Sequence, residues 1–188
     1  MLHARSPRLL AICVALAALL ALPSPSDAAR KKRTTCANTA VAPSAGNVAT
    51  VRAAVLCLHN RERAARRLAP LRQHAKLRRA ADGHSADMVA DRYFSHQTPE
   101  GTDMVERILR AGFARGSGWL LGENIAWGSG EFATAAQIHR SWMNSPGHRA
   151  NILRREFRWI GIGIALGAPV DTGGLAGATY TADFGVRR

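Results

Sequence analysis

Apolar residues recur at helical spacing in two segments of the first half of the chain. Val51, Val55 and Leu58 are separated by four and then three positions, which predicts a first helix over residues 48–66. A second helix is expected over residues 74–92. One face of this second helix carries Leu77, Ala81, His84 and Met88. His84 is therefore expected to point inward or toward the edge of a cleft, and the pattern does not distinguish these two positions.

Two further helices are predicted in the second half. Residues 103–112 favour a short helix, and residues 131–143 favour a longer one that Pro146 ends, since proline disfavours helical geometry in the residue before it. The apolar stripe expected on the longer helix consists of Phe132, Ala135, Ala136, His139, Trp142 and Met143.

Strict alternation of side chains predicts two strands near the C-terminus. In residues 158–166, isoleucine and leucine alternate with small residues, including Gly161 and Gly163, so one face is nearly bare and a helix can approach it closely. In residues 178–185, apolar positions alternate with polar ones. Helices followed by antiparallel strands indicate the α+β class.

The N-terminal segment is typical of an export signal. Residues 1–28 combine arginines, a short apolar stretch and small residues at the cleavage position, so we predict a signal peptide, with a retained anchor as the alternative. Residues 29–49 are rich in basic residues, Pro, Ser and Ala, which predicts a linker. A single domain is expected over residues 50–188. Nothing after the signal is apolar enough to span a membrane.

Two cysteines, Cys36 and Cys57, remain after removal of the predicted signal. An even number of cysteines in an exported protein favours a disulfide bond, and two free thiols are the alternative. Isolated cysteines lack the paired spacing of a cysteine-ligated metal site.

The chain is strongly basic, with 26 lysines and arginines against 13 acidic residues and a formal net charge of +13. Such a charge favours anionic partners, such as an acidic envelope polymer or a lipid headgroup, although it is also compatible with an ordinary solvated surface. No basic motif interleaved with aromatic residues indicates specific nucleic-acid binding.

Three short motifs place candidate site residues beside turn-forming sequence. They are Tyr-Phe-Ser-His at 93–96, Gly-Glu-Asn-Ile-Ala-Trp at 122–127, and Ser-Pro-Gly-His-Arg at 145–149. Side chains near turns are often presented to a cleft, so His96, Glu123 and His148 form a plausible shared site.

These motifs, in this order, resemble the CAP superfamily, also called SCP domains, and the Ser-Pro-Gly-His-Arg form resembles its compact bacterial branch. The resemblance extends over about residues 50–188 and includes Leu-His-Asn-Arg-Glu-Arg at 58–63 and His-Ser-Ala-Asp-Met at 84–88. It implies an α-β-α sandwich with a small central antiparallel sheet. It also implies a secreted, extracellular or periplasmic protein, which we expect to be a monomer.

The resemblance implies a ligand cleft lined by His96, Glu123, Ser145 and His148. His96 and His148 match the two histidines of the family cleft, and Glu123 matches one of its two acids. The position of the second acid, three residues after Trp142, holds Ser145. One carboxylate is therefore missing, and a mechanism with paired acid and base carboxylates is not expected from these motifs.

His96, His148 and Glu123 remain suitable ligands for a divalent metal such as Zn²⁺. We therefore predict a non-enzymatic extracellular binding module for a metal, a lipid or an envelope component, with no organic cofactor. The alternative is a metal-dependent, protease-like hydrolase in which Zn²⁺ on the two histidines activates water and Glu123 is the base or third ligand.

Overall fold

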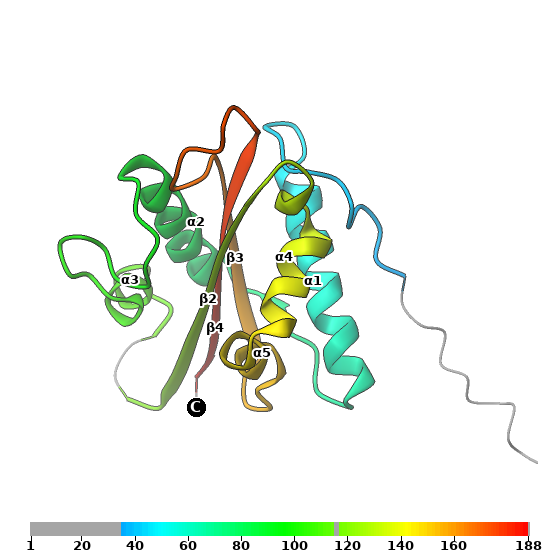
Figure 1. Ribbon diagram of the computed structural model, residues 1–188. Helices are drawn as coiled ribbons and strands as arrows, with labels where there is room; N and C mark the ends of the chain where they lie inside the picture. The colour runs from blue at the N-terminus through cyan, green and yellow to red at the C-terminus, as the bar shows by residue number, and fades with distance from the viewer. Residues whose placement is uncertain (1–34, 115–116, 188) are drawn as a thin grey trace, which may run out of the picture. The chain divides into compact units, whose positions relative to one another are not determined.

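The computed structural model describes residues 35–114 and 117–187. These residues form three layers around a four-stranded sheet of order β1-β3-β4-β2 (Figure 1). Helix α2 (Ala75–Ala90) packs on β3 and β4 from one side. Helices α1 (Val48–Ala65) and α4 (Ala135–Asn144) contact the sheet from the other side. The predicted α+β class and sandwich architecture are confirmed.

The strands are β1 (Arg72–Gln73), β2 (Trp119–Ser129), β3 (Trp159–Leu166) and β4 (Gly177–Arg187). The three long strands are antiparallel, whereas the two-residue β1 runs parallel to β3, so the sheet is mixed. The last two strands agree with the alternation in the sequence. The pattern did not predict β1 or β2, because β1 has only two residues and β2 is buried on both faces over its central part.

Glycines on β3 allow the sheet to approach α2 closely, as their pattern predicts. A Cβ atom at Gly161 or Gly163 would collide with the backbone of α2 at Leu77 or Ala81. The side chains that alternate with these glycines, Ile160 and Ile162, are fully buried in the core on the opposite face. Any larger residue at either glycine would separate α2 from the sheet.

The segment predicted as one helix over residues 131–143 is divided in the structure. A 3₁₀ turn, η1 (Gly130–Ala133), precedes α4. Thr134 has an extended backbone, and its side chain caps the N-terminus of α4. This break removes Phe132 from the apolar stripe, and its side chain is 60% exposed. The placement of Phe132 on the buried face was therefore wrong, because a threonine N-cap begins a new helix.

The remaining helices are short. Helix α3 (Met104–Arg110) is close to its predicted span and begins at an Asp103 cap that accepts a hydrogen bond from the backbone of Glu106. Helix α5 (Pro146–Leu153) begins directly after α4, with proline in its first turn. His148 consequently lies within the first turn of a helix rather than in a non-helical turn.

Arg63 joins α1 to the segment between α5 and β3. Its side chain is fully buried, and it donates hydrogen bonds to the carbonyl oxygens of four residues. These residues are Ala69, Ile152, Arg154 and Phe157. A guanidinium group suits this place because it supplies several donors in a fixed planar arrangement.

The predicted disulfide between Cys36 and Cys57 is present, with Cα atoms 5.7 Å apart. A second link connects the segment before α1 to the domain, since the amide of Ala136 donates to the carbonyl of Thr39. The predicted signal peptide, residues 1–28, lies outside the described residues. Within the described residues, no helix has the length and apolar character needed to cross a membrane.

Candidate functional site

Glu123, in the middle of β2, connects two elements through its carboxylate. Oε1 lies 2.8 Å from Nδ1 of His96, and Oε2 accepts a 2.7 Å hydrogen bond from Nη2 of Arg107. The side chain of Glu123 is only 2% exposed, whereas that of His96 is 55% exposed. Arg107, on α3, also donates to the carbonyl oxygens of His96 and Thr102. The loop that carries His96 is thus held by the same arginine that pairs with Glu123.

The charges around Glu123 determine how His96 presents its ring. Burial by itself raises the pKa of Glu123, but the hydrogen bond from His96 and the positive charge of Arg107 outweigh it and lower that pKa. An ionised carboxylate only accepts hydrogen bonds, so Nδ1 of His96 carries the proton that it shares with Glu123. In the neutral ring, Nε2 then keeps its lone pair for a ligand.

His84 supports the loop from beneath. It is fully buried, its Nε2 lies 2.9 Å from the carbonyl oxygen of Ser95, and its Nδ1 lies 3.3 Å from the hydroxyl of Tyr93. Burial lowers the pKa of His84 to about 4, despite the nearby charge of Glu123. The ring is therefore neutral at physiological pH, with Nε2 donating and Nδ1 accepting. Of the two positions left open by the sequence, His84 takes the inward one.

Asp183 adds a second carboxyl group that the motif comparison did not find. It lies on β4 directly opposite Glu123 and is 1% exposed. Burial, and then the negative charge of Glu123, raises the pKa of Asp183 well above its usual range. Two carboxyl groups are therefore present, and both are almost fully buried.

His148 lies in the first turn of α5, and its pKa is lowered by burial and then by the charge of His96. Two asparagines hold α5 against β2: Asn124 donates to the carbonyl oxygen of His148, and Asn151 donates to that of Glu123. Ser145 lies between α4 and α5, where its side chain forms no cap for α5.

The three ligands predicted for a metal are not equivalent. In residues 35–114 and 117–187, no three histidine, cysteine or acidic side chains form a metal-binding group. Both oxygens of Glu123 take part in hydrogen bonds, with His96 and Arg107, so Glu123 orients the ring of His96. His96 and His148, both imidazoles, remain available as a pair of nitrogen donors.

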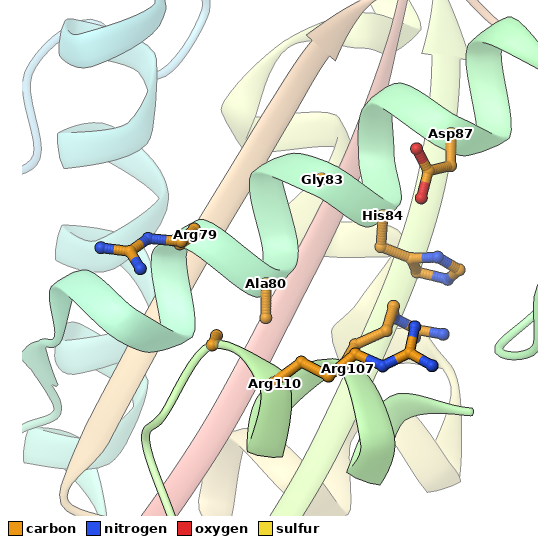
Figure 2. A pocket seen from close by; sticks show the side chains of 8 residues that line it. Arg79, Ala80, Gly83, His84, Asp87, Arg107 and Arg110 are labelled. Carbon is orange, nitrogen blue, oxygen red and sulfur yellow. The ribbon is translucent and has the colours of Figure 1, made fainter. Parts of the chain in front are cut away.

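A pocket of about 290 Å³ lies next to this network, between α2 and α3. Figure 2 shows that His84 and Asp87 enter it from α2 and that Arg107 and Arg110 enter it from α3. His84 and Arg107 thus separate this pocket from Glu123.

Sequence patterns gave no signal for Arg107, whose position on a short helix is set by the fold. Asp183 did have a signal, because it falls on the polar face of a predicted strand.

Comparison with known proteins identifies the family. The family model of the cysteine-rich secretory protein family, CAP, matches residues 56–181. The chain belongs to the CAP family. The match includes His84, His96, Glu123 and His148, together with the whole of α2 through β3.

Curated relatives in the family are longer than the region they share with this CAP domain. YkwD of Bacillus subtilis is 37% identical over 109 residues, which is 58% of this chain and 40% of that protein. The membrane protein YlbC of the same species is 30% identical over 112 residues, which is 58% of this chain and 30% of that protein. The chain therefore matches less than half the length of each.

Solved structures share the fold. An extracellular protein containing an SCP domain from Bacillus anthracis is 27% identical, with a TM-score of 0.57, and the match covers 75% of this chain and 44% of that one. An outer surface protein of Borrelia burgdorferi has a TM-score of 0.56 at 20% identity, covering 69% of this chain and 87% of that one. At that identity, the second likeness concerns the fold alone.

Proposed function

We propose that this CAP protein is an extracellular binding module whose cleft uses the Nε2 atom of His96 as its main contact. The 2.8 Å hydrogen bond between His96 and Glu123 supports the proposal most directly. A buried carboxylate behind an exposed imidazole fixes the tautomer and orientation of the ring and increases the basicity of its outer nitrogen. This arrangement is typical of histidines that bind a metal or accept a hydrogen bond from a ligand.

A divalent cation, for which Zn²⁺ is the appropriate probe, is the ligand that best suits two neighbouring imidazoles. His96 and His148 would hold the ion, and water or donors of a second ligand would complete its coordination. Zinc would supply Lewis acidity and a site for anionic groups. Two protein ligands are fewer than structural zinc sites use, so we expect an affinity well below that of such sites.

Binding is favoured over the alternative of a metal-dependent hydrolase. Hydrolysis needs a carboxylate that is free to take a proton from water. Glu123 has both oxygens engaged, by His96 and Arg107, and Asp183 is buried behind it. Neither carboxylate is placed to serve as that base.

Export is part of the proposal. It is supported by the signal-like sequence of residues 1–28 and by the Cys36–Cys57 disulfide, a bond that persists in oxidising compartments. The extracellular SCP protein of Bacillus anthracis agrees with this location. N-terminal sequencing of secreted material is expected to begin near Ala29.

Isothermal titration with Zn²⁺ at pH 7.5 tests the cleft. The wild-type protein is expected to bind one ion, and His96→Ala or His148→Ala is expected to weaken binding at least tenfold. His74→Asn is the matched control, because His74 lies at the N-terminus of α2 and asparagine preserves its capping hydrogen bond. Unchanged affinity in the His96→Ala, His148→Ala double variant would refute the site. Zinc-dependent cleavage of a peptide library that requires Glu123 would instead favour the hydrolase.

A further inference from the structure

We infer that one end of the domain is a docking surface for a linear polymer that carries repeated phosphate groups. This surface, which we call the basic end, is formed by seven exposed arginines. They are Arg66, Arg67, Arg72, Arg154, Arg155, Arg158 and Arg187. The inference is independent of the cleft and uses no residue proposed to bind zinc.

The fold brings these arginines together from four parts of the chain. Three of them, the C-terminal end of α1, the segment between α5 and β3, and the end of β4, lie at the lower end of Figure 1, and the fourth is β1, which carries Arg72. Backbone hydrogen bonds connect the parts: the amide of Arg72 donates to the carbonyl of Arg158, and the amide of Arg158 donates to that of Gly185. The buried Arg63 ties α1 to the carbonyls of Arg154 and Phe157. These hydrogen bonds connect the segments that carry the arginines.

Few carboxylates balance this charge. Residues 62–73, 153–160 and 185–187 contain two acidic side chains, Glu62 and Glu156. Glu62 pairs with Arg66 at 2.7 Å, and Glu156 lies 3.8 Å from Arg154. Burial, and then the positive charge of Arg158, lowers the pKa of the buried Arg63. An anionic partner would relieve this repulsion.

The composition of the basic end favours a soluble polyanion over a lipid bilayer. Among the described residues, the exposed large apolar side chains lie elsewhere, and they are Val41, Phe94, Leu109, Trp127, Phe132, Leu166, Val170 and Leu175. Stable attachment to a bilayer combines charge with apolar side chains that enter it, and the basic end supplies only charge. All seven cations are arginines, whose planar guanidinium groups pair with the oxygens of a phosphate or a carboxylate, and a phosphate chain offers the denser row of negative charges.

Binding of long-chain inorganic polyphosphate, measured by fluorescence anisotropy from 50 to 300 mM salt, tests the inference. The logarithm of the affinity is expected to fall linearly with the logarithm of the salt concentration. Arg72→Glu/Arg155→Glu is expected to weaken binding at least tenfold at 150 mM salt and to reduce the salt slope by about 2, one unit for each lost contact. Neither side chain has a hydrogen-bond partner among the described residues, so folding should be preserved.

Arg79→Glu/Arg140→Glu is the matched control, because it changes the net charge equally at exposed positions away from the basic end. It is expected to weaken binding less than threefold. Equal losses in the two double variants would contradict a localised surface and leave only diffuse attraction. Binding to anionic phospholipid vesicles without binding to polyphosphate would also overturn the inference. Polygalacturonate, which carries carboxylates in place of phosphates, is expected to bind more weakly, and stronger binding of it would refute the preference for phosphate.

Discussion

Glu123 on β2 and Asp183 on β4 lie directly opposite one another in the sheet, and each carboxyl group is almost fully buried. The pKa values of the two groups are shifted in opposite directions. The pKa of Glu123 is lowered by His96 and Arg107, while the pKa of Asp183 is raised by burial and by the charge of Glu123. The negative charge is thus favoured on the carboxylate that contacts His96 and disfavoured on Asp183.

Asp183→Asn should stabilise the protein more at pH 7 than at pH 4. A carboxyl group whose pKa is raised by folding contributes stability below its unfolded pKa and loses it as the pH rises. Asparagine has a similar shape and does not titrate. Urea denaturation at the two pH values measures the difference, with the exposed Asp171→Asn as control. An identical change in unfolding free energy at both pH values would contradict a protonated Asp183.

The buried imidazoles of His59 and His139 should make the protein sensitive to acid. Their Nδ1 atoms lie 3.1 Å apart, and burial lowers the pKa of His59 well below its usual range and that of His139 to about 4. Between about pH 6.5 and pH 4, these histidines are protonated in the unfolded chain but stay neutral in the folded chain. The unfolding free energy should therefore decrease as the pH is lowered, by up to about 1.4 kcal/mol per pH unit for each histidine.

The matching measurement is a series of urea denaturation curves over that pH range. His59→Asn/His139→Gln removes both titrating groups, so its unfolding free energy should depend less steeply on pH than that of the wild type. The same slope in both proteins would show that other groups are responsible for acid sensitivity.

Arg63→Ala is expected to cost about 3–5 kcal/mol of unfolding free energy, the scale for losing one partner of a buried charged network. Four carbonyl oxygens lose their donor in this variant. Arg63→Lys should retain only a small part of the unfolding free energy that Arg63→Ala loses, since an ammonium group cannot reproduce the planar arrangement of donors. Chemical denaturation checks both values, and Arg66→Ala, at an exposed position one turn later, should cost less than about 1 kcal/mol. A stable Arg63→Ala protein would disprove the role of Arg63 as a tie.

Trp142→Ala is expected to cost about 3–5 kcal/mol, as large aromatic deletions from cores do. Trp142 is fully buried, and its indole nitrogen donates to the carbonyl oxygen of Ile125 at 3.0 Å. Phe132→Ala, at the exposed position ten residues earlier, should cost less than about 1 kcal/mol. Thermal and urea denaturation of the two variants give the comparison. Comparable losses of unfolding free energy in Trp142→Ala and Phe132→Ala would contradict the break between η1 and α4 that exposes Phe132.

Local periodicity was sufficient to predict most of the fold. The repeats of Val51, Val55 and Leu58, and the glycines at 161 and 163, identify elements whose burial is strongly one-sided. Periodicity failed where this asymmetry is absent. Strand β2 is buried on both faces around Glu123, and β1 has only two residues, so neither produces a readable pattern. At Thr134, a capping hydrogen bond outweighed an apolar stripe that otherwise continued through Phe132.

The candidate site was predictable only in part. The motifs around His96, Glu123 and His148 indicated a shared site, and the structure pairs His96 with Glu123. The role of Glu123 was not predictable, because it depends on Arg107, which reaches it from a helix 16 positions away in the chain. Asp183 falls on the polar face of a predicted strand, but only strand pairing places it opposite Glu123.

We propose that Glu123 fixes the ring of His96 so that Nε2 is open to a ligand. A long-range ¹H–¹⁵N correlation spectrum of the histidine side chains, recorded with and without Zn²⁺, tests it most directly. We expect His96 to carry its proton on Nδ1, and zinc to shift the Nε2 resonance of His96 and a ring nitrogen of His148 while leaving His59 and His84 unchanged. A proton on Nε2 of neutral His96, or spectra of His96 and His148 that do not respond to zinc, would contradict the account.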